Sequence, residues 1–154
     1  MAIERRIVLR SALALVGAGL ASPVLTGAAA AAPTVTVYRD ESCSCCGAWV
    51  RRMEAEGFSV TVVNVDDLPA RKAGVHLPDK LWSCHTATVE GYVVEGHVPP
   101  ASVKRLLSER PRARGIAVAG MPAGSPGMEA GARKDRYPVM IFGNGARPAV
   151  WEWH

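Results

Sequence analysis

Three of the four cysteines lie within residues 43–46 (Cys-Ser-Cys-Cys), and the fourth, Cys84, directly precedes a histidine. Three thiols so close together cannot all pair in one disulfide, and the adjacent Cys45 and Cys46 can hardly pair with each other. A bridge from Cys43 to Cys46 would close too short a loop to add much stability to a fold. The cluster therefore predicts chemistry, either thiol–disulfide exchange or the binding of a soft metal ion.

The spacing inside the cluster suits both kinds of chemistry. Cys43 and Cys46 form a Cys-x-x-Cys pair, which is the spacing of redox disulfides. Cys43 and Cys45 form a Cys-x-Cys pair, in which two thiolates can converge on one metal ion or bridge two ions. The cysteines alone leave both interpretations open.

Further soft donors occur outside the cluster. Cys84 and His85 form a candidate second half of the site, and His97 follows a predicted hairpin. Met121 and Met128 belong to a loop rich in glycine and proline, although packing under a lid would explain them equally well. Thioether sulfur selects Cu(I), and imidazole binds copper well. Copper thus accounts for the cysteines, histidines and methionines together.

Zinc is the alternative metal. Four thiolates, or three thiolates and one imidazole, make a good tetrahedral zinc site, but zinc gives the methionine loop no role. We interpret His76, in a loop flanked by Gly and Pro, as a solvated residue, and His154, at the C-terminus, as incidental. The sequence shows no hydrolase triad and no glycine-rich phosphate loop.

The N-terminal segment is typical of a bacterial export signal. Arg5 and Arg6 precede an apolar run over 11–20, and small residues follow, so we predict a signal peptide over 1–31. The paired arginines resemble the core of twin-arginine signals, and an ordinary secretory signal stays open as an almost equal alternative. The apolar run is too short for a lasting membrane span. The predicted mature chain, 32–154, is long enough for one domain.

Composition excludes one class of partner. The chain carries a formal net charge of +4 with no clustered basic stripe, so nucleic acid is not indicated as a ligand. An exported location is oxidising, which makes disulfide chemistry available to the cysteines.

The elements that position the cysteines begin with a parallel unit. A β-branched run over 34–38 predicts a strand, an amphipathic pattern over 48–56 predicts a helix that ends at Gly57, and 58–65 predicts a second strand. A strand, a helix and a strand in this order indicate a parallel βαβ unit, with the cysteines in the loop before the helix. A short helical turn is expected over 66–72.

The rest of the chain predicts an insertion and a closing hairpin. Residues 87–94 read as a hairpin around Glu90-Gly91, and 101–109 as a helix. The stretch 115–131 has no periodicity and predicts an ordered loop or lid. Strands over 138–142 and 149–153 close the fold. This plan predicts an α/β, thioredoxin-like fold, with Pro138 as a cis-proline that faces the cysteines.

Taken together, the motifs of this chain resemble those of the CopG-type copper-resistance proteins, an exported bacterial metal-binding family. The resemblance covers essentially the whole predicted mature chain, in order. It is carried by Cys43-x-Cys45-Cys46-Gly47-x-Trp49, Ser83-Cys84-His85-Thr86-Ala87, Tyr92-Val93-x-Glu95-Gly96-His97-Val98-Pro99 and Gly120-Met121-Pro122-x-Gly124-Ser125-Pro126-Gly127-Met128-Glu129.

The resemblance implies a thioredoxin-like protein of the periplasm that binds copper at its Cys-x-Cys-Cys motif, as a multinuclear cluster, and interconverts Cu(I) and Cu(II). It also implies a periplasmic copper chaperone, an efflux protein or an electron-transfer protein as partner, and Pro138 as a support facing the cluster. Two alternatives stay open, a thiol–disulfide oxidoreductase using Cys43 and Cys46, and a zinc-binding structural module. The implied thiolate ligands are Cys43, Cys45, Cys46 and Cys84, and the implied further ligands or gates are His85, His97, Met121 and Met128.

Overall fold

The computed structural model describes residues 31–129, 131–143 and 145–154. The predicted signal peptide therefore lies outside the described residues, except for its last position. Ala31–His154 form one compact unit. Within the described part of the chain, no helix is both long and apolar enough to cross a membrane.

The predicted parallel unit is confirmed. Strand β1 (Thr34–Arg39) and strand β2 (Ser59–Asn64) pair in parallel, and helix α1 (Ser44–Ala55) connects them. The helix begins at Ser44 rather than at residue 48, so Cys45 and Cys46 lie in its first turn and Cys43 is the N-cap. The prediction placed the start too late because it treated the whole cysteine motif as loop.

The next elements also follow the sequence pattern. Helix α2 (Leu68–Gly74) is capped by Asp67, whose carboxylate accepts a hydrogen bond of 2.8 Å from the backbone of Ala70. A short 3₁₀ turn, η1 (Asp79–Leu81), leads to strands β3 (His85–Val89) and β4 (Tyr92–Glu95), which form the predicted antiparallel hairpin. Helix α3 (Pro100–Glu109) follows.

The prediction of an irregular stretch over 115–131 is wrong at its start. Strand β5 (Gly115–Ala117) is buried and lies between β4 and strand β6 (Pro138–Phe142). Three residues are too few to show a period of two, which is why the sequence pattern did not reveal this strand. Strand β7 (Ala149–Trp153) pairs with β6 as predicted, while residue 144 of the connecting turn lies outside the described residues.

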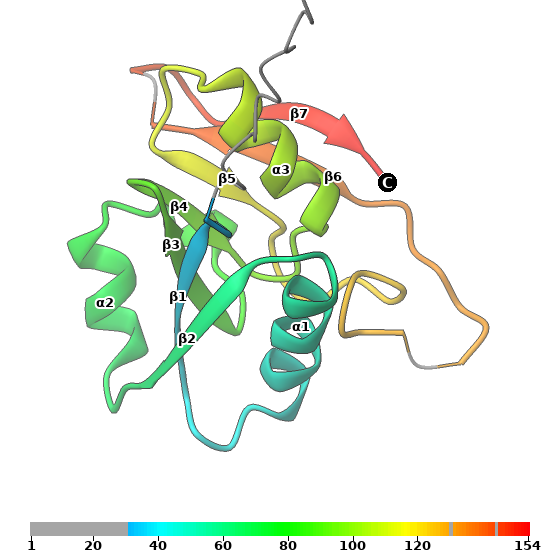
Figure 1. The fold of residues 1–154 in the computed structure, drawn as a ribbon. Coiled ribbons are helices and arrows are strands. Elements are labelled where there is room, and N and C mark those ends of the chain that lie inside the picture. Colours follow the sequence, from blue (N-terminus) through cyan, green and yellow to red (C-terminus); the bar gives the residue numbers. More distant parts are fainter. Residues whose placement is uncertain (1–30, 130, 144) are drawn as a thin grey trace, which may run out of the picture. The chain divides into compact units, whose positions relative to one another are not determined.

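The strands form one mixed sheet in the order β2-β1-β3-β4-β5-β6-β7 (Figure 1). Helices α1 and α3 contribute Trp49, Met53 and Leu106 to a core on one face. A smaller core holds Leu77 and Leu81, from the segment after α2, against the sheet. Because side chains alternate along a strand, neighbouring residues of β3 point to opposite faces.

The hypothesis about Pro138 is wrong in both respects. Among the described residues no peptide bond is cis. Pro138 also begins β6, which is separated from β1 by β3, β4 and β5 (Figure 1). The strand beside β1 is β3, and it begins at His85, directly after Cys84. The order of strands in a sheet depends on long-range pairing that the sequence pattern does not reveal.

Candidate metal centre

The cysteine loop connects the end of β1 to the start of α1 in a tight turn. Asp40 accepts hydrogen bonds from the backbone and the hydroxyl of Ser42, at 2.8 and 2.5 Å. The backbone N–H of Cys43 donates to the carbonyl of Asp40 at 3.1 Å, and Arg39 donates to the carbonyl of Cys43 at 2.8 Å. These bonds fix where the first cysteine enters the helix.

The four sulfur atoms converge at this point. The Sγ atoms of Cys43, Cys45, Cys46 and Cys84 lie within 4.8 Å of one another, and we call these residues the thiol group. Cys43 and Cys46 form a disulfide, whereas Cys45 and Cys84 are free. Cys45 Sγ lies 3.5 Å from Cys43 Sγ and 3.7 Å from Cys84 Sγ. The structure thus shows the oxidised form of the Cys-x-x-Cys pair inside a four-sulfur cluster.

A second set of donors shares Cys84 with the first. Donor atoms of Cys84, His85 and His97, which we call the imidazole group, also lie within 4.8 Å of one another. Cys84 Sγ is 3.0 Å from His97 Nε2 and 3.4 Å from His85 Nδ1. The two imidazole rings are 5.1 Å apart between centroids, at a near-perpendicular angle of 82°. Cys84 therefore stands between the other thiols and the imidazoles.

Hydrogen bonding fixes the tautomer of His97. Its Nδ1 atom lies 2.8 Å from the carbonyl oxygen of Pro126. A carbonyl can only accept, so Nδ1 carries the proton, and the lone pair of Nε2 faces the thiol of Cys84. This arrangement, with one ring nitrogen bonded to a carbonyl and the other directed at a site, is typical of histidines that bind metals.

Burial keeps both histidines uncharged. Burial is the main reason that the pKa of His85 lies well below 6.5, and the electrostatic effects of His97 and Lys72 act in the same direction. The Gly96 carbonyl opposes this shift, yet Nε2 of His85 makes no hydrogen bond of good geometry. The pKa of His97 is lowered by burial as well, against the opposing effects of the Pro126 carbonyl and Glu129. Neutral imidazoles are the form that binds metal ions.

The thiol of Cys84 is held in its protonated form. Burial raises its pKa to about 12, and the nearby thiol of Cys45 adds to the effect. A metal ion can replace that proton, because thiolates bind metals and thiols do not. The arrangement therefore fits a soft metal ion at Cys84.

Two glycines let the chain segments approach closely enough. A Cβ atom on Gly96, where φ is +70°, would lie 2.5 Å from the side chain of Ser83 and from the carbonyl oxygen of Val118. A Cβ atom on Gly127, where φ is +87°, would lie 2.7 Å from the backbone nitrogen of Trp49 and 3.0 Å from the carbonyl oxygen of Cys45. The sequence contained both glycines, but their close contacts are visible only in the fold.

The structure separates the two loop methionines. Met128 lines an open cavity of about 420 Å³ together with Cys45, Gly127 and Glu129, and Glu129 forms an ion pair of 3.0 Å with Arg52 of α1. Met121 is 54% exposed. Its neighbour Gly120 bonds to the segment before Cys84, through the backbone of Trp82 and the hydroxyl of Ser83. The exposed position of His76 agrees with its interpretation as a solvated residue.

A buried ion pair lies directly behind the imidazole group. Lys72 of α2 and Glu95 of β4 are 2.5 Å apart, with exposures of 3% and 0%. Glu95 also accepts hydrogen bonds of 2.6 Å from the backbone of Ser83 and from the hydroxyl of Thr86. We call these four residues the ion-pair network. The sequence offered no signal for it beyond two ordinary charged residues.

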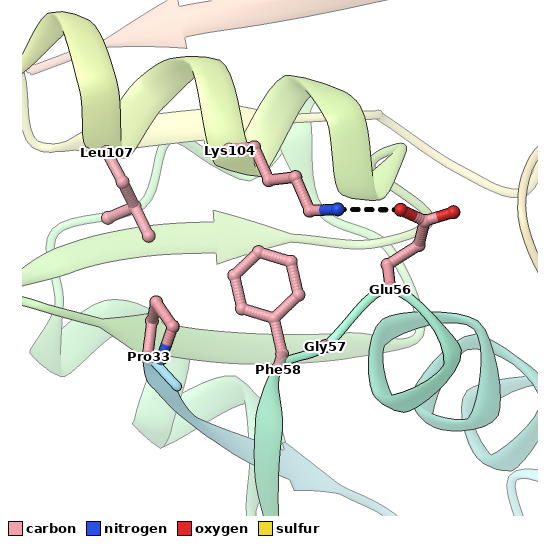
Figure 2. Close-up of a pocket in the computed structure, with 6 residues that line it drawn as sticks. All are labelled: Pro33, Glu56, Gly57, Phe58, Lys104 and Leu107. Carbon is pink, nitrogen blue, oxygen red and sulfur yellow. Dashed lines mark hydrogen bonds and ion pairs between the residues drawn. The ribbon is translucent and has the colours of Figure 1, made fainter. Parts of the chain in front are cut away.

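The pocket in Figure 2 provides a contrast at the opposite end of β1. Pro33, Phe58 and Leu107 line its apolar part, and an ion pair of 2.7 Å between Lys104 and Glu56 lies at its side (Figure 2). Its volume is about 250 Å³, and its lining includes no cysteine, histidine or methionine. The soft donors described above thus belong to the end of β1 where the cysteine loop begins.

Comparisons with known proteins agree with the donor set. Residues 81–128 match the family described as "Protein of unknown function, DUF411". That segment contains Cys84, both histidines of the imidazole group and both loop methionines. No curated protein sequence matches the chain.

Two solved structures share both sequence and fold with this chain. One is described as "Copper resistance protein copG- Form 2"; it is 41% identical, with a TM-score of 0.76, and the match covers 80% of this chain and 98% of that one. The other, "Copper resistance protein copG- Form 1", is also 41% identical, with a TM-score of 0.74 and coverage of 79% and 96%. The chain therefore belongs to the family of CopG copper resistance proteins.

Proposed function

We propose that this chain binds copper ions in copper resistance, through Cys45, Cys84, His85 and His97. Cys43 and Cys46 join as thiolates when their disulfide is reduced. The observation that carries the proposal is the position of Cys84 Sγ, 3.7 Å from the Cys45 sulfur and 3.0 Å from the Nε2 atom of His97. A thiolate there contacts both groups of donors and can bridge metal ions, so we infer a multinuclear centre.

The chemistry of the donors favours copper over harder ions. Thiolates and thioethers select Cu(I), and imidazole is a good copper ligand. Both histidines are buried and neutral, so neither must lose a proton before it binds. Met128 lies beside Cys45 at the cavity and is the better placed thioether ligand, while Met121 is a candidate ligand or gate on the same loop.

The disulfide provides a balanced route between the two valences of copper. When the thiolates of Cys43 and Cys46 join, one S–S bond forms and two electrons are released. Two Cu(II) ions each accept one of these electrons and become Cu(I). The reverse reaction breaks the S–S bond and returns both copper ions to Cu(II). We propose that the centre interconverts Cu(I) and Cu(II) in this way.

We further infer a thioredoxin-like core made of β1, α1, β2, α2, β3, β4 and α3. The place that the sequence assigned to Pro138, opposite the cysteines, belongs in this arrangement to Cys84 at the start of β3. We propose export to the periplasm through the segment 1–31, with a copper chaperone, an efflux protein or an electron-transfer protein as partner.

A second function is favoured by one observation, the disulfide between Cys43 and Cys46. In that case the chain is a thiol–disulfide oxidoreductase, and Cys45 or Cys84 attacks the bridge as a resolving thiol. Cys45 Sγ lies 3.5 Å from Cys43 Sγ, which is close enough to approach the bridge. This function requires neither imidazoles nor methionines.

The test is to purify the chain without oxygen, reduce it, and measure bound copper and zinc by mass spectrometry. We expect copper to bind in preference to zinc, Cys45→Ser to lose most of it, and Met121→Leu to lose less. Preferential zinc binding would support a structural zinc module. Disulfide reductase turnover that survives in Cys45→Ser, in a protein without copper affinity, would support the oxidoreductase.

A further inference from the structure

The ion-pair network contacts both segments that carry the imidazole group. Ser83 and Thr86 flank Cys84 and His85 in sequence, and both donate to the carboxylate of Glu95. Lys72 donates to Glu95 at 2.5 Å and to the hydroxyl of Thr86 at 3.0 Å, so that Lys72, Thr86 and Glu95 form a closed ring of hydrogen bonds. The network therefore restrains the Cys84–His85 dipeptide on both sides.

The same carboxylate fixes the segment of the other histidine. Glu95 lies opposite Thr86 in the register of β3 and β4, just before Gly96 and His97. The backbone of Gly96 donates to the carbonyl of His85 at 3.0 Å. One side chain thus joins the end of β4, two residues before His97, to the start of β3, directly after Cys84.

The network lies on the face of β3 opposite to the ring of His85. His85 contacts Trp49 of α1, with ring centroids 4.6 Å apart. Thr86, the next residue of β3, contacts Lys72 of α2. Since neighbouring residues of a strand point to opposite faces, Thr86 and the network lie across β3 from the ring of His85.

Stability alone does not explain a buried pair of charges. Removing two charges from water costs about as much as their attraction returns, and well-packed apolar residues often stabilise a protein equally well. Here the charges also hold a backbone N–H and a hydroxyl at the two ends of the donor segment. That is the form of support that orients metal ligands from outside the coordination sphere.

We propose that Lys72 and Glu95 are positioning residues that hold Cys84 and His97 at the separation required for metal binding. The inference rests on the proposed copper function, since it assigns these two residues a role in that same site. It predicts that the network determines metal affinity as well as the geometry of the donors before any metal binds.

The test replaces the pair by uncharged residues of similar size, Lys72→Met with Glu95→Met. Reduced protein is titrated with Cu(I) against a competing chelator, and stability is followed by urea unfolding. We expect Cu(I) affinity to fall by about 10–100-fold, the usual effect of losing outer support, in a protein that still unfolds cooperatively. The thiolate-to-metal absorption of the Co(II)-loaded variant should also shift.

The chain offers a matched control, the exposed Lys104–Glu56 pair beside the pocket in Figure 2. Lys104→Met with Glu56→Met removes the same types of charge at the opposite end of β1. This double variant should leave the Cu(I) affinity and the Co(II) spectrum unchanged. A milder variant, Thr86→Val, removes one hydroxyl of the network and should weaken affinity in the same direction. Thr86→Val tests the positioning role if the Lys72→Met, Glu95→Met double variant does not fold.

The metal-free proteins separate this inference from the copper function. Side-chain ¹⁵N shifts should show His97 as a single Nδ1–H tautomer in the wild type and a mixture in the double variant. If the wild type binds no copper but this difference appears, the copper function fails and the positioning role stands. Wild-type affinity, spectrum and tautomer in a folded double variant, or in Thr86→Val if the double variant does not fold, would overturn the inference.

Discussion

The imidazole group and the ion-pair network are two polar clusters at the same end of the β3–β4 hairpin, and they differ in the charge of their members. In the network, both carboxylate oxygens of Glu95 accept hydrogen bonds from neighbouring residues. In the imidazole group, the thiol of Cys84 lies between two neutral rings and faces Nδ1 of His85 and Nε2 of His97. A fully paired ion pair holds a structure together, whereas a thiol beside neutral imidazoles can exchange its proton for a metal ion.

Among the changes that test this comparison, replacing Cys84 by serine should have the largest effect on Cu(I) affinity. The substitution removes the sulfur that both donor groups share, so Cu(I) affinity should fall by more than the 10–100-fold typical of residues outside the coordination sphere. Chelator competition measures the affinity, and urea unfolding measures the stability. The replacement is small and Cys84 is only partly buried, so the fold should remain.

His76→Ala is the control for this measurement, since His76 is an exposed histidine in a loop. It should bind copper as the wild type does. Unchanged affinity in Cys84→Ser would mean that Cys84 does not ligate copper. The comparison of the imidazole group with the ion-pair network would then say nothing about metal binding.

Replacing Gly127 by alanine should have the next largest effect. The new Cβ atom would lie 2.7 Å from the backbone of Trp49, at a φ of +87°. The loop must therefore move away from α1, which weakens the hydrogen bond from His97 to Pro126. Backbone strain at this φ alone costs about 1–3 kcal/mol of stability, and the clash adds to that cost. Urea unfolding measures the stability, and NMR of His97 reports on the hydrogen bond.

Gly131→Ala separates the clash from backbone strain. Gly131 has a similar φ of +75°, but a Cβ atom there would meet nothing within 4 Å. This variant should lose less stability and keep the His97 signal of the wild type. Equal losses in the two variants would show that backbone strain, and not contact with α1, explains the result.

Acidification should have the smallest effect of the three changes. The sign of its effect on the free energy of unfolding differs between the imidazole group and the ion-pair network. The folded-state pKa values of His85 and His97 lie below 6.5, so below that pH the unfolded chain binds more protons than the folded one. Stability from these histidines is complete above pH 6.5 and is lost as the pH falls towards the lowered values, by at most about 1.4 kcal/mol per pH unit for each histidine.

Glu95 has the opposite sign, because burial raises its pKa above 4.5 and the folded state holds the proton more tightly. Its contribution to stability is complete below pH 4.5 and falls as the pH rises through the raised value. Urea unfolding of the metal-free wild type and of His97→Gln between pH 5 and 7.5 isolates the histidine effect by difference. Parallel curves would show that His97 is not buried as a neutral ring.

Local patterns predicted most of the elements, because strand alternation, helical periodicity and turn residues can each be recognised within a short stretch of sequence. The β1-α1-β2 unit and the hairpin around Glu90 followed from such patterns. Strand β5 did not, since it has only three residues and depends on pairing with β4 and β6. Pro138 was misplaced for a related reason, because strand order depends on distant pairing.

The candidate site divides in the same way. Residue types and spacing predicted the candidate donors, since sulfur and imidazole are recognisable without a structure, and the fold brings their cysteines and His85 and His97 together. The fold was needed to bring Cys84 to the cysteine loop and to reveal the supporting residues. Lys72 and Gly127 have ordinary neighbours in the sequence, and only the fold shows the contact of Lys72 with Glu95 and the close approach of Gly127 to α1.

The hydrogen bond from His97 to the carbonyl of Pro126 has a consequence for regulation. The bond couples the conformation of the loop to the tautomer of His97, because the carbonyl of Pro126 holds the proton on Nδ1 only while the loop is in place. Displacement of the loop frees Nδ1 and allows the proton to move to Nε2, the atom that faces the sulfur of Cys84. If the site binds copper as proposed, a molecule that moves the loop changes the affinity without touching the donors.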